Sequence, residues 1–268
     1  MTSKKDLLGL KVFNAVAFVI MVATNALANI FRLNGTNTGE VSNAYPNLFT
    51  PAVITFSIWG LIYLLLGLFV LYQFGLFDKK TPVRDDALQE IGLFFGISSL
   101  ANAAWVFAWQ YHKILLSVLL LFIILICVGI IATRLSNKKF TQKEKIFIRL
   151  PFSVYFGWLT VALIANITAF LVSIHWNGWG ISDQIWTVVV MLVGVVIGIA
   201  VTLKNKDIAY GLTLIWAYLG ILIKHVSAGG FHGQYPAVII TAVVSMVLFA
   251  MTVVYVYSEK KKKKILKK

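Results

Sequence analysis

Three apolar stretches of the chain carry tryptophan, tyrosine and asparagine at helical spacing. The repeating residues are Pro51, Thr55, Trp59, Tyr63 and Gly67 in the first stretch, Asn102, Trp105 and Trp109 in the second, and Trp158, Ala162 and Asn166 in the third. Residues three or four apart lie on the same face of a helix, so each stretch presents a stripe of rings and amides. Indole rings stack on flat apolar molecules and amides orient polar atoms, which is the chemistry of binding rather than of bond breaking.

The groups that ordinary catalysis needs are scarce in the apolar stretches. No Asp or Glu lies deep within any of them, and the only cysteine is Cys127. The chain therefore offers no buried proton relay and no grouping of acid, base and nucleophile, and we expect it not to be a hydrolase or a transferase. The histidines near the ends of the stretches are His112, His175, His225 and His232. Because no carboxylates accompany them, we expect interfacial histidines; ligation of a metal or a haem iron is the alternative.

The stripes need membrane-spanning helices to position them. Hydrophobic residues make up 59% of the 268 residues and charged residues only 13%, which is typical of an integral membrane protein. About 20 apolar residues of helix cross the hydrocarbon core of a bilayer. The segments that qualify as spans one to eight are Leu8–Phe31, Pro51–Leu76, Glu90–Trp109, Ile114–Thr133, Phe147–Ile174, Gln184–Leu203, Ile208–Lys224 and Pro236–Tyr257. Because these runs are continuous rather than alternating, the sequence predicts an all-α polytopic membrane bundle in contact with the lipid bilayer.

The basic residues predict how the bundle is oriented. Eight spans put both termini on one side, and all 24 Lys and Arg residues except Arg32, Lys113 and Lys224 fall on that side. Lys and Arg in short loops stay in the cytoplasm, so we expect a multi-pass protein of the cell membrane with both termini cytoplasmic. The net charge of +14 has the same origin, and the tail 258–268 is expected to contact anionic headgroups rather than nucleic acid.

A count of residues from the outer end of each span places several polar and aromatic side chains at one depth. At 1.5 Å per residue, Asn25, Trp59, Asn102 and Asn166 fall roughly 10 to 12 Å below the outer surface. Spans two, three and five are therefore expected to enclose an outward-opening pocket beneath the loop 33–50, which is either a lid or an ordinary solvated loop. The alternative is that the amides join helices and the indoles only pack. The tryptophans expected in an interfacial belt are Trp176, Trp179 and Trp186.

The same stripes resemble a known family. The segments PAVITFSIWGLIY, LANAAWVFAW and LPFSVYFGWLTVALIAN are similar, in this order, to three signature segments of the TspO/MBR family, the translocator or tryptophan-rich sensory proteins. The resemblance covers about residues 8–174 and implies a five-helix unit that binds tetrapyrroles, such as protoporphyrin IX or haem, beneath its first long loop. The residues that it implies as pocket lining are Trp59, Asn102, Trp158, Ala162 and Asn166. The chain departs from the family pattern at Phe152, where a tyrosine is common, and in its last three spans.

The resemblance also suggests a division of the chain and an oligomeric state. It predicts a five-helix TspO/MBR-like unit over 1–174, a three-helix extension over 175–257 and a basic cytoplasmic tail over 258–268. Family members often form homodimers, and the GxxxG step of Gly92 and Gly96 in span three offers an interface. Close packing of this step within one chain is the alternative.

The favoured interpretation is a receptor or sensor that binds a small flat hydrophobic ligand, such as a tetrapyrrole, and requires no cofactor. The expected ligand-binding residues are Asn25, Trp59, Tyr63, Asn102, Trp105, Trp158, Ala162 and Asn166. Arg32, Lys113 and Lys224 at the outer rim could meet ligand carboxylates. The alternatives are a transporter of such ligands and a light-dependent porphyrin-degrading activity, which the resemblance implies for some members.

Overall fold

The structure, a computed structural model, describes residues 4–77 and 85–266 as a bundle of long helices. Within these residues, eight helices are long and apolar enough to cross a membrane, and no strand occurs. The long helices are α1 (Lys4–Asn29), α3 (Ile58–Gln73), α4 (Asp85–Gln110), α5 (Ile114–Ser136), α7 (Leu150–Ser173), α8 (Asp183–Asn205), α9 (Ile208–Val226) and α10 (Pro236–Ile265). The predicted all-α fold with eight spans is confirmed, and the chain is a multi-pass membrane protein.

Short helical turns connect the long helices. They are η1 (Leu33–Gly35), α2 (Thr38–Asn43), η2 (Val53–Ser57), α6 (Gln142–Glu144), the π-helical turn η3 (Lys145–Arg149) and η4 (Gly178–Gly180). The sequence marks the start of α2 clearly, because the Asn37 side chain accepts hydrogen bonds from the backbone N–H groups of Gly39 and Glu40. The Glu40 carboxylate accepts one in return from the N–H of Asn37, which completes a capping box.

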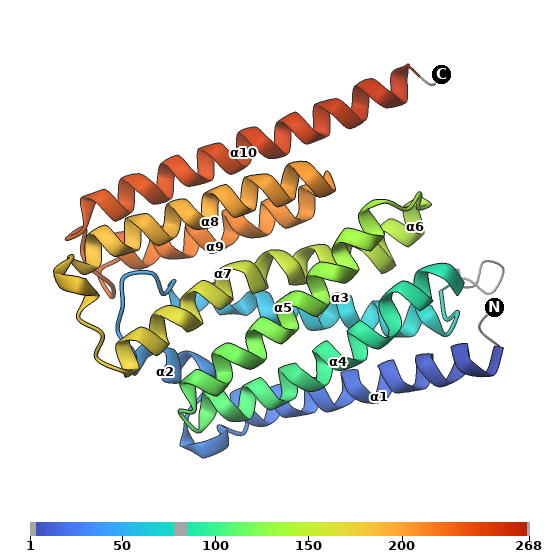
Figure 1. Ribbon diagram of the computed structural model, residues 1–268, viewed down its shortest axis with the longest axis horizontal. Helices are drawn as coiled ribbons and strands as arrows, with labels where there is room; N and C mark the ends of the chain where they lie inside the picture. Colours follow the sequence, from blue (N-terminus) through green and yellow to red (C-terminus); the bar gives the residue numbers. More distant parts are fainter. Residues whose placement is uncertain (1–3, 78–84, 267–268) are drawn as a thin grey trace.

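The helices form two groups, which meet where α7 of the first packs on α9 of the second. Figure 1 shows α1 and α4 along one side of the molecule, α3, α5 and α7 in the middle, and α8, α9 and α10 along the other side. The N-terminus and the C-terminus lie at the same end of the bundle (Figure 1), which we call the termini end; the other is the loop end. Helix α9 packs on α7, and α10 packs on both α8 and α9.

The second span does not begin as predicted. A 3₁₀-helical turn occupies Val53–Ser57, and the α-helix begins only at Ile58, so the four-residue stripe does not extend back to Pro51 and Thr55. A 3₁₀-helix has 3.0 residues per turn rather than 3.6, so Thr55 within this turn leaves the four-residue register. Pro51 precedes the turn and still lines a cavity together with Trp59. The stripe is therefore correct only within α3.

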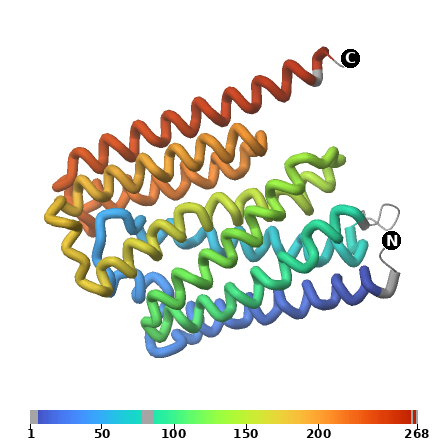
Figure 2. Tube along the Cα trace, in the orientation of Figure 1, coloured from blue at the N-terminus to red at the C-terminus, as the bar shows by residue number. Residues whose placement is uncertain are grey.

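Helix α9 explains the position of this 3₁₀-helical turn. The N–H of Ala52 donates to the carbonyl oxygen of Gly220 over 3.0 Å, and the Trp216 indole donates to the carbonyl oxygen of Thr55 over 3.1 Å. Because a Cβ at Gly220 would overlap the Thr55 side chain, only glycine lets the two segments approach so closely. Figure 2 shows the segment after α1, in blue, reaching the orange helices of the second group. The C-terminal spans thus cover one flank of the first five.

The GxxxG step of α4 is used inside the chain. A Cβ added at Gly92 would overlap the Leu10 side chain of α1, and one added at Gly96 would overlap the ring of Phe13. The two glycines therefore allow α1 and α4 to pack closely. Since α1 covers this face, Gly92 and Gly96 cannot also form a dimer interface.

We expect Gly92→Ala to lower the free energy of unfolding by about 1–3 kcal/mol, because the added methyl group overpacks the α1–α4 contact. The matched control is Gly60→Ala in α3, where an added Cβ meets no atom within 4 Å and should be neutral or slightly stabilising. Thermal unfolding of both variants in the same detergent measures the difference. Equal melting temperatures would contradict the close packing of α1 on α4.

Candidate functional site

Aromatic rings from three helices meet around Trp59. The ring centroid of Trp59 lies 5.6 Å from that of Tyr63, which stacks on it, and 5.8 Å from that of Trp105 on α4. On the α7 side, the rings of Tyr155 and Trp158 both lie 6.1 Å from it and meet it edge to face. The structure thus brings the predicted stripes of spans two, three and five together. Edge-to-face and stacked pairs of this kind add about 0.5–1.5 kcal/mol each beyond the area that they bury.

The predicted asparagines join helices beside these rings. The Asn25 amide on α1 donates to the Asn102 side-chain oxygen on α4 over 2.8 Å, and the Asn102 amide donates to the Tyr155 hydroxyl over 3.2 Å. Asn166 on α7 is not bonded to these two asparagines; its side-chain oxygen accepts a hydrogen bond of 2.9 Å from the Ser117 hydroxyl on α5. For all three asparagines the geometry shows interhelical hydrogen bonds, the alternative that the sequence left open.

The space near the rings is divided into two cavities. The smaller one, the inner cavity, has a volume of about 40 Å³ and lies between α3, α4 and α7. The larger one, the α1–α3 cavity, has a volume of about 390 Å³ and lies against α1 and α3. Trp59 lines both and forms part of the wall between them. Ligand pockets usually measure about 300–1,000 Å³, so of these two cavities the α1–α3 cavity, and not the inner cavity, is large enough in this conformation to hold a ligand.

The expected ligand-binding residues are distributed over both cavities. Those lining the inner cavity are Trp59, Trp105, Trp158, Ala162 and Asn166, and those lining the α1–α3 cavity are Asn25, Trp59 and Tyr63. Asn102 lines neither cavity and holds Asn25 and Tyr155 in place instead. The region between spans two, three and five, where we expected the pocket, is largely filled by the aromatic rings, and the larger hollow lies between spans one and two.

Buried polar atoms without a partner lie at both cavities. The indole N–H groups of Trp105 and Trp158 have no hydrogen-bond acceptor in the described chain, although the two residues are only 6% and 2% exposed. Both side chains line the inner cavity. The Tyr63 hydroxyl at the α1–α3 cavity is also buried without a partner. A buried donor without an acceptor costs about 1–3 kcal/mol, so the fold tolerates a penalty that an acceptor atom on a ligand would remove.

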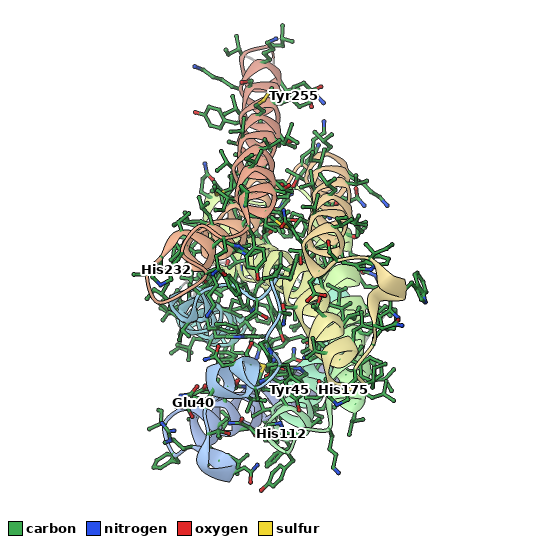
Figure 3. All side chains as sticks on the ribbon, turned by 90° about the vertical axis from the view of Figure 1, so that its left-hand side faces the viewer. Glu40, Tyr45, His112, His175, His232 and Tyr255 are labelled. Carbon is green, nitrogen blue, oxygen red and sulfur yellow. The ribbon has the colours of Figure 1, made fainter. Side chains whose placement is uncertain are left out.

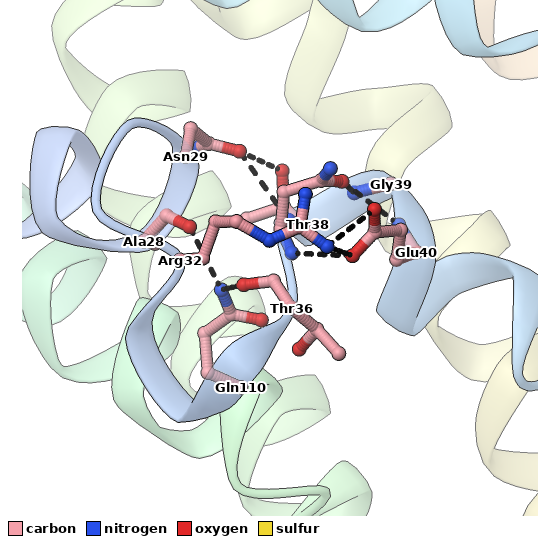
Figure 4. Close-up of polar contacts among 9 residues, drawn as sticks. Ala28, Asn29, Arg32, Thr36, Thr38, Gly39, Glu40 and Gln110 are labelled. Carbon is pink, nitrogen blue, oxygen red and sulfur yellow. Dashed lines mark hydrogen bonds and ion pairs between the residues drawn. The ribbon is translucent and has the colours of Figure 1, made fainter.

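The segment after α1 forms a roof over the cavities. The Asn29 side-chain oxygen accepts hydrogen bonds from the backbone N–H and the hydroxyl of Thr38, and the Gln110 amide donates to the carbonyl oxygens of Ala28 and Thr36 (Figure 4). The Trp109 indole donates to the carbonyl oxygen of Thr38 over 3.0 Å. These contacts fix α2 to α1 and α4. Thr38 lines both cavities, so α2 has the position expected of a lid.

An exposed ion pair lies at the edge of this roof. The Arg32 guanidinium donates to both Glu40 carboxylate oxygens over 2.8 and 2.7 Å (Figure 4). The backbone N–H of Asn37, and after it Arg32, lower the pKa of the Glu40 carboxyl group below its ordinary value. Both carboxylate oxygens of Glu40 already engage the Arg32 guanidinium. We therefore no longer expect Arg32 to bind a ligand carboxylate.

The histidines do not converge on one centre. Figure 3, which views the loop end, shows His232 apart from His112 and His175. The His112 Nδ1 lies 2.8 Å from the Tyr45 hydroxyl, and the buried His225 Nε2 lies 2.8 Å from the carbonyl oxygen of Leu48. Among the described residues, no three His, Cys, Asp or Glu side chains are grouped so that they could hold a metal ion.

The tryptophans expected in an interfacial belt form a second cluster, remote from Trp59. Trp176, Trp179 and Trp186 lie at the loop end of α7 and α8, with ring centroids 5.2–5.7 Å apart. Trp179 is 75% exposed and, like its neighbours, lines neither the inner cavity nor the α1–α3 cavity. Its indole can therefore serve as a control for experiments on the site.

Two residues of the site did not figure among the expected ones. Tyr155 contacts the Trp59 ring and accepts the hydrogen bond from Asn102, and the Phe56 ring meets Trp158 edge to face at 5.9 Å. The signal for Tyr155 is its position three residues before Trp158, which puts both rings on one face of a helix. Phe56 carries no such signal, because it lies in the 3₁₀-helical turn before α3.

Comparison with known proteins gives one finding that covers most of the chain. A family model described as TSPO-like protein matches residues 11–255. The match includes α8, α9 and most of α10 and is thus not confined to the first five spans. No curated protein and no solved structure matches the chain significantly.

Proposed function

The chain belongs to the TSPO-like family, and we propose on that basis that it is a membrane receptor or sensor for a flat hydrophobic ligand of the tetrapyrrole class, such as a porphyrin or haem. The site would be the ring cluster around Trp59, with the inner cavity on one side and the α1–α3 cavity on the other. Stacking on indoles would supply much of the affinity, and hydrogen bonds to the free indole N–H groups would orient the ligand.

The observation that carries the proposal is the pair of unpartnered indole N–H groups of Trp105 and Trp158 at one small cavity. Packing alone does not require an indole N–H at these positions, and each buried donor without an acceptor carries a cost that a ring without a polar atom avoids. An apolar ligand with hydrogen-bond acceptors would satisfy both donors in a place from which bulk water is nearly excluded. Such a ligand fits the sensory proteins that the sequence resembles.

Binding of a large ligand would require movement of the Trp59 ring. The inner cavity holds only about 40 Å³, whereas the neighbouring α1–α3 cavity holds about 390 Å³, and the half-buried Trp59 side chain stands between them. Rotation of this one side chain would join the two spaces and keep its indole available for stacking. The unpaired indole N–H groups at the inner cavity and the larger α1–α3 cavity would then belong to one binding site.

The proposed orientation follows from the distribution of charge. Within the described part of the chain, the Lys and Arg residues other than Arg32, Lys113 and Lys224 belong to the termini end, so this end would face the cytoplasm of a cell membrane. The roof formed by α2 would then face outward, and the ligand would reach the site from the outer half of the bilayer.

The direct test is titration of the purified protein with protoporphyrin IX, followed by tryptophan fluorescence. We expect saturable quenching with one ligand per chain, and we expect Trp158→Phe to weaken binding about fivefold to tenfold, because it keeps a ring but removes a donor. The matched control, Trp179→Phe, changes an exposed indole outside the site and should bind as the wild type does. Absence of saturable quenching, or equal affinities for the two variants, would contradict the proposed site.

A second measurement separates a receptor from a carrier. The receptor proposal predicts that proteoliposomes retain porphyrin on the side to which it is added, whereas a transporter of such ligands would equilibrate it across the bilayer. Illumination of the bound porphyrin tests the third possibility, a light-dependent degrading activity. Such an activity would destroy more than one porphyrin molecule per protein chain, which loss of porphyrin absorbance measures.

A further inference from the structure

A third cavity lies at the loop end between the roof and the start of the loop after α9. It has a volume of about 280 Å³, and one wall is formed by the segment 42–50. The opposite wall consists of Lys224 and the turn that contains Gly229, Gly230 and Phe231. Its lining is more polar than that of the two cavities at Trp59 and includes Ser42, Asn43, Asn47, Thr50 and Lys224. We call it the rim cavity.

Lys224 is the charged group of the rim cavity, and no carboxylate neutralises it. The acidic residues at the loop end are Glu40, which is paired with Arg32, and Asp183, which lines a separate cavity between α7 and α8. Lys224 forms no ion pair with any described residue, and its ammonium lies 5.9 Å from the centre of the Phe231 ring. A cation that is held in a cavity and lacks a counter-ion favours an anionic ligand.

Neutral donors accompany the ammonium. The Ser42 hydroxyl and the Asn43 amide line the rim cavity, and neither side chain has a hydrogen-bond partner among the described residues. Ser42 also lines the inner cavity beside Trp109 and Trp158. Ser42 therefore lies between the inner cavity and the rim cavity, so that the two cavities adjoin at this residue.

The backbone fixes both walls of the rim cavity. The N–H of Phe231 donates to the carbonyl oxygen of Lys224 over 3.0 Å, and a Cβ at Gly230 would overlap that same oxygen, so this tight turn requires glycine. The neighbouring His225 bridges to the opposite wall through its hydrogen bond with the carbonyl oxygen of Leu48. The cation is thus held by built structure rather than on a free loop.

We propose that the rim cavity is a carboxylate-binding subsite, in which Lys224, Ser42 and Asn43 receive an acidic substituent of the ligand. The inference rests on the proposed function, since it requires the apolar part of the ligand to occupy the site at Trp59. It narrows the ligand class to flat hydrophobic molecules that carry at least one carboxylate. It also gives the C-terminal spans a direct role in recognition, because Lys224 belongs to α9.

The test compares two ligands that differ only in charge, protoporphyrin IX with its two free carboxylates and the uncharged protoporphyrin IX dimethyl ester. Both are titrated into the full-length protein in a neutral detergent. We expect Lys224→Met, which keeps the length of the side chain, to weaken binding of the diacid about fivefold and to leave the affinity for the ester unchanged. The control variant is Lys113→Met, an exposed lysine at the same end that lines none of the three cavities and should alter neither affinity.

The outcomes separate the subsite from the site at Trp59. If both ligands bind the wild type and Lys224→Met weakens both equally or neither, the subsite is wrong while the site at Trp59 stands. If Lys113→Met reproduces the selective loss, the effect is one of general surface charge and the subsite is again wrong. If the wild type binds neither ligand, the proposed function fails and the subsite fails with it.

Discussion

Replacement of Trp59 by alanine is expected to weaken binding of protoporphyrin IX by about one to two orders of magnitude. Trp59 lines both the inner cavity and the α1–α3 cavity, and its ring contacts those of Tyr63, Trp105, Tyr155 and Trp158. A ligand that occupies both cavities would therefore stack on the Trp59 indole. Stacking of a flat ring system on an aromatic side chain contributes about 1–3 kcal/mol, and each 1.4 kcal/mol corresponds to a factor of ten in affinity.

The measurement needs variants that separate stacking from folding. Trp59→Phe keeps an aromatic ring and should bind with an affinity between those of the wild type and Trp59→Ala. Trp179→Ala removes an indole of the same size from an exposed position and should leave affinity unchanged. Thermal unfolding of each variant without ligand shows whether the bundle is intact. Because Trp59 is only half-buried, its loss should destabilise the protein less than loss of a fully buried indole.

Two results would count against the role of Trp59. One is tighter binding to Trp59→Ala, which would mean that the indole only blocks the passage between the cavities. The other is an unchanged affinity with an intact fold, which would place the ligand elsewhere. In either case the divided space around this residue would be a packing feature of the bundle.

The number and type of spans could be predicted because each span depends only on a short continuous segment of the sequence. A continuous apolar run of about 20 residues has to be a helix in lipid, whatever surrounds it. The stacked pair of Trp59 and Tyr63 was predictable for the same reason, since residues four apart on one helix share a face. The GxxxG step of Gly92 and Gly96 indicated close packing, although the sequence alone could not identify α1 as its partner.

The interior of the site could not be predicted at the same level. Counting residues along a helix gives the depth of a side chain but not its direction around the bundle axis. Depth alone therefore grouped Asn166 with Asn25 and Asn102, whereas Asn166 turns toward Ser117 on α5. The division of the space by Trp59 depends on rotamers of several large rings at once, and such packing leaves no periodic pattern in the sequence.

Contacts between the two helix groups could not be predicted from the sequence either. The 3₁₀-helical turn before α3 is coupled to α9 through Ala52, Thr55, Trp216 and Gly220, which are far apart along the chain. Helix propensity within span two favoured an α-helix that begins at Pro51, and the tertiary contact overrode it. The C-terminal spans thus shape the segment that leads directly into Trp59.

A further connection between the groups lies at the termini end. We expect Asp207→Ala, which removes it, to lower the free energy of unfolding by about 3 kcal/mol. The Asp207 side chain is 6% exposed and caps α9 by accepting a hydrogen bond of 3.2 Å from the N–H of Tyr210. It also accepts a hydrogen bond from the Ser153 hydroxyl on α7 and lies 3.9 Å from the guanidinium of Arg149. Alanine would remove these contacts together.

The size of the effect follows from what remains after the substitution. Arg149, which is only 19% exposed, would keep its hydrogen bond of 2.7 Å to the carbonyl oxygen of Asn205 but lose the nearby carboxylate. The first turn of α9 would lose its cap, and Ser153 would lose its acceptor inside the α7–α9 contact. Asp207→Asn should cost less, because its amide oxygen can still accept from the N–H of Tyr210, while its amide nitrogen can donate to the Ser153 hydroxyl.

A carboxylate at the same end of the molecule provides the control. Glu259 pairs with Lys206 over 3.0 Å, but both side chains are about a third or more exposed, and Glu259→Gln should therefore change stability little. Thermal unfolding in detergent gives the order of stability, and hydrogen exchange locates the change. We expect Asp207→Ala to accelerate amide exchange in the first turns of α9, with little change in α1 and α4. Uniformly faster exchange, or a stability equal to that of Glu259→Gln, would show that Asp207 does not hold α9 on α7.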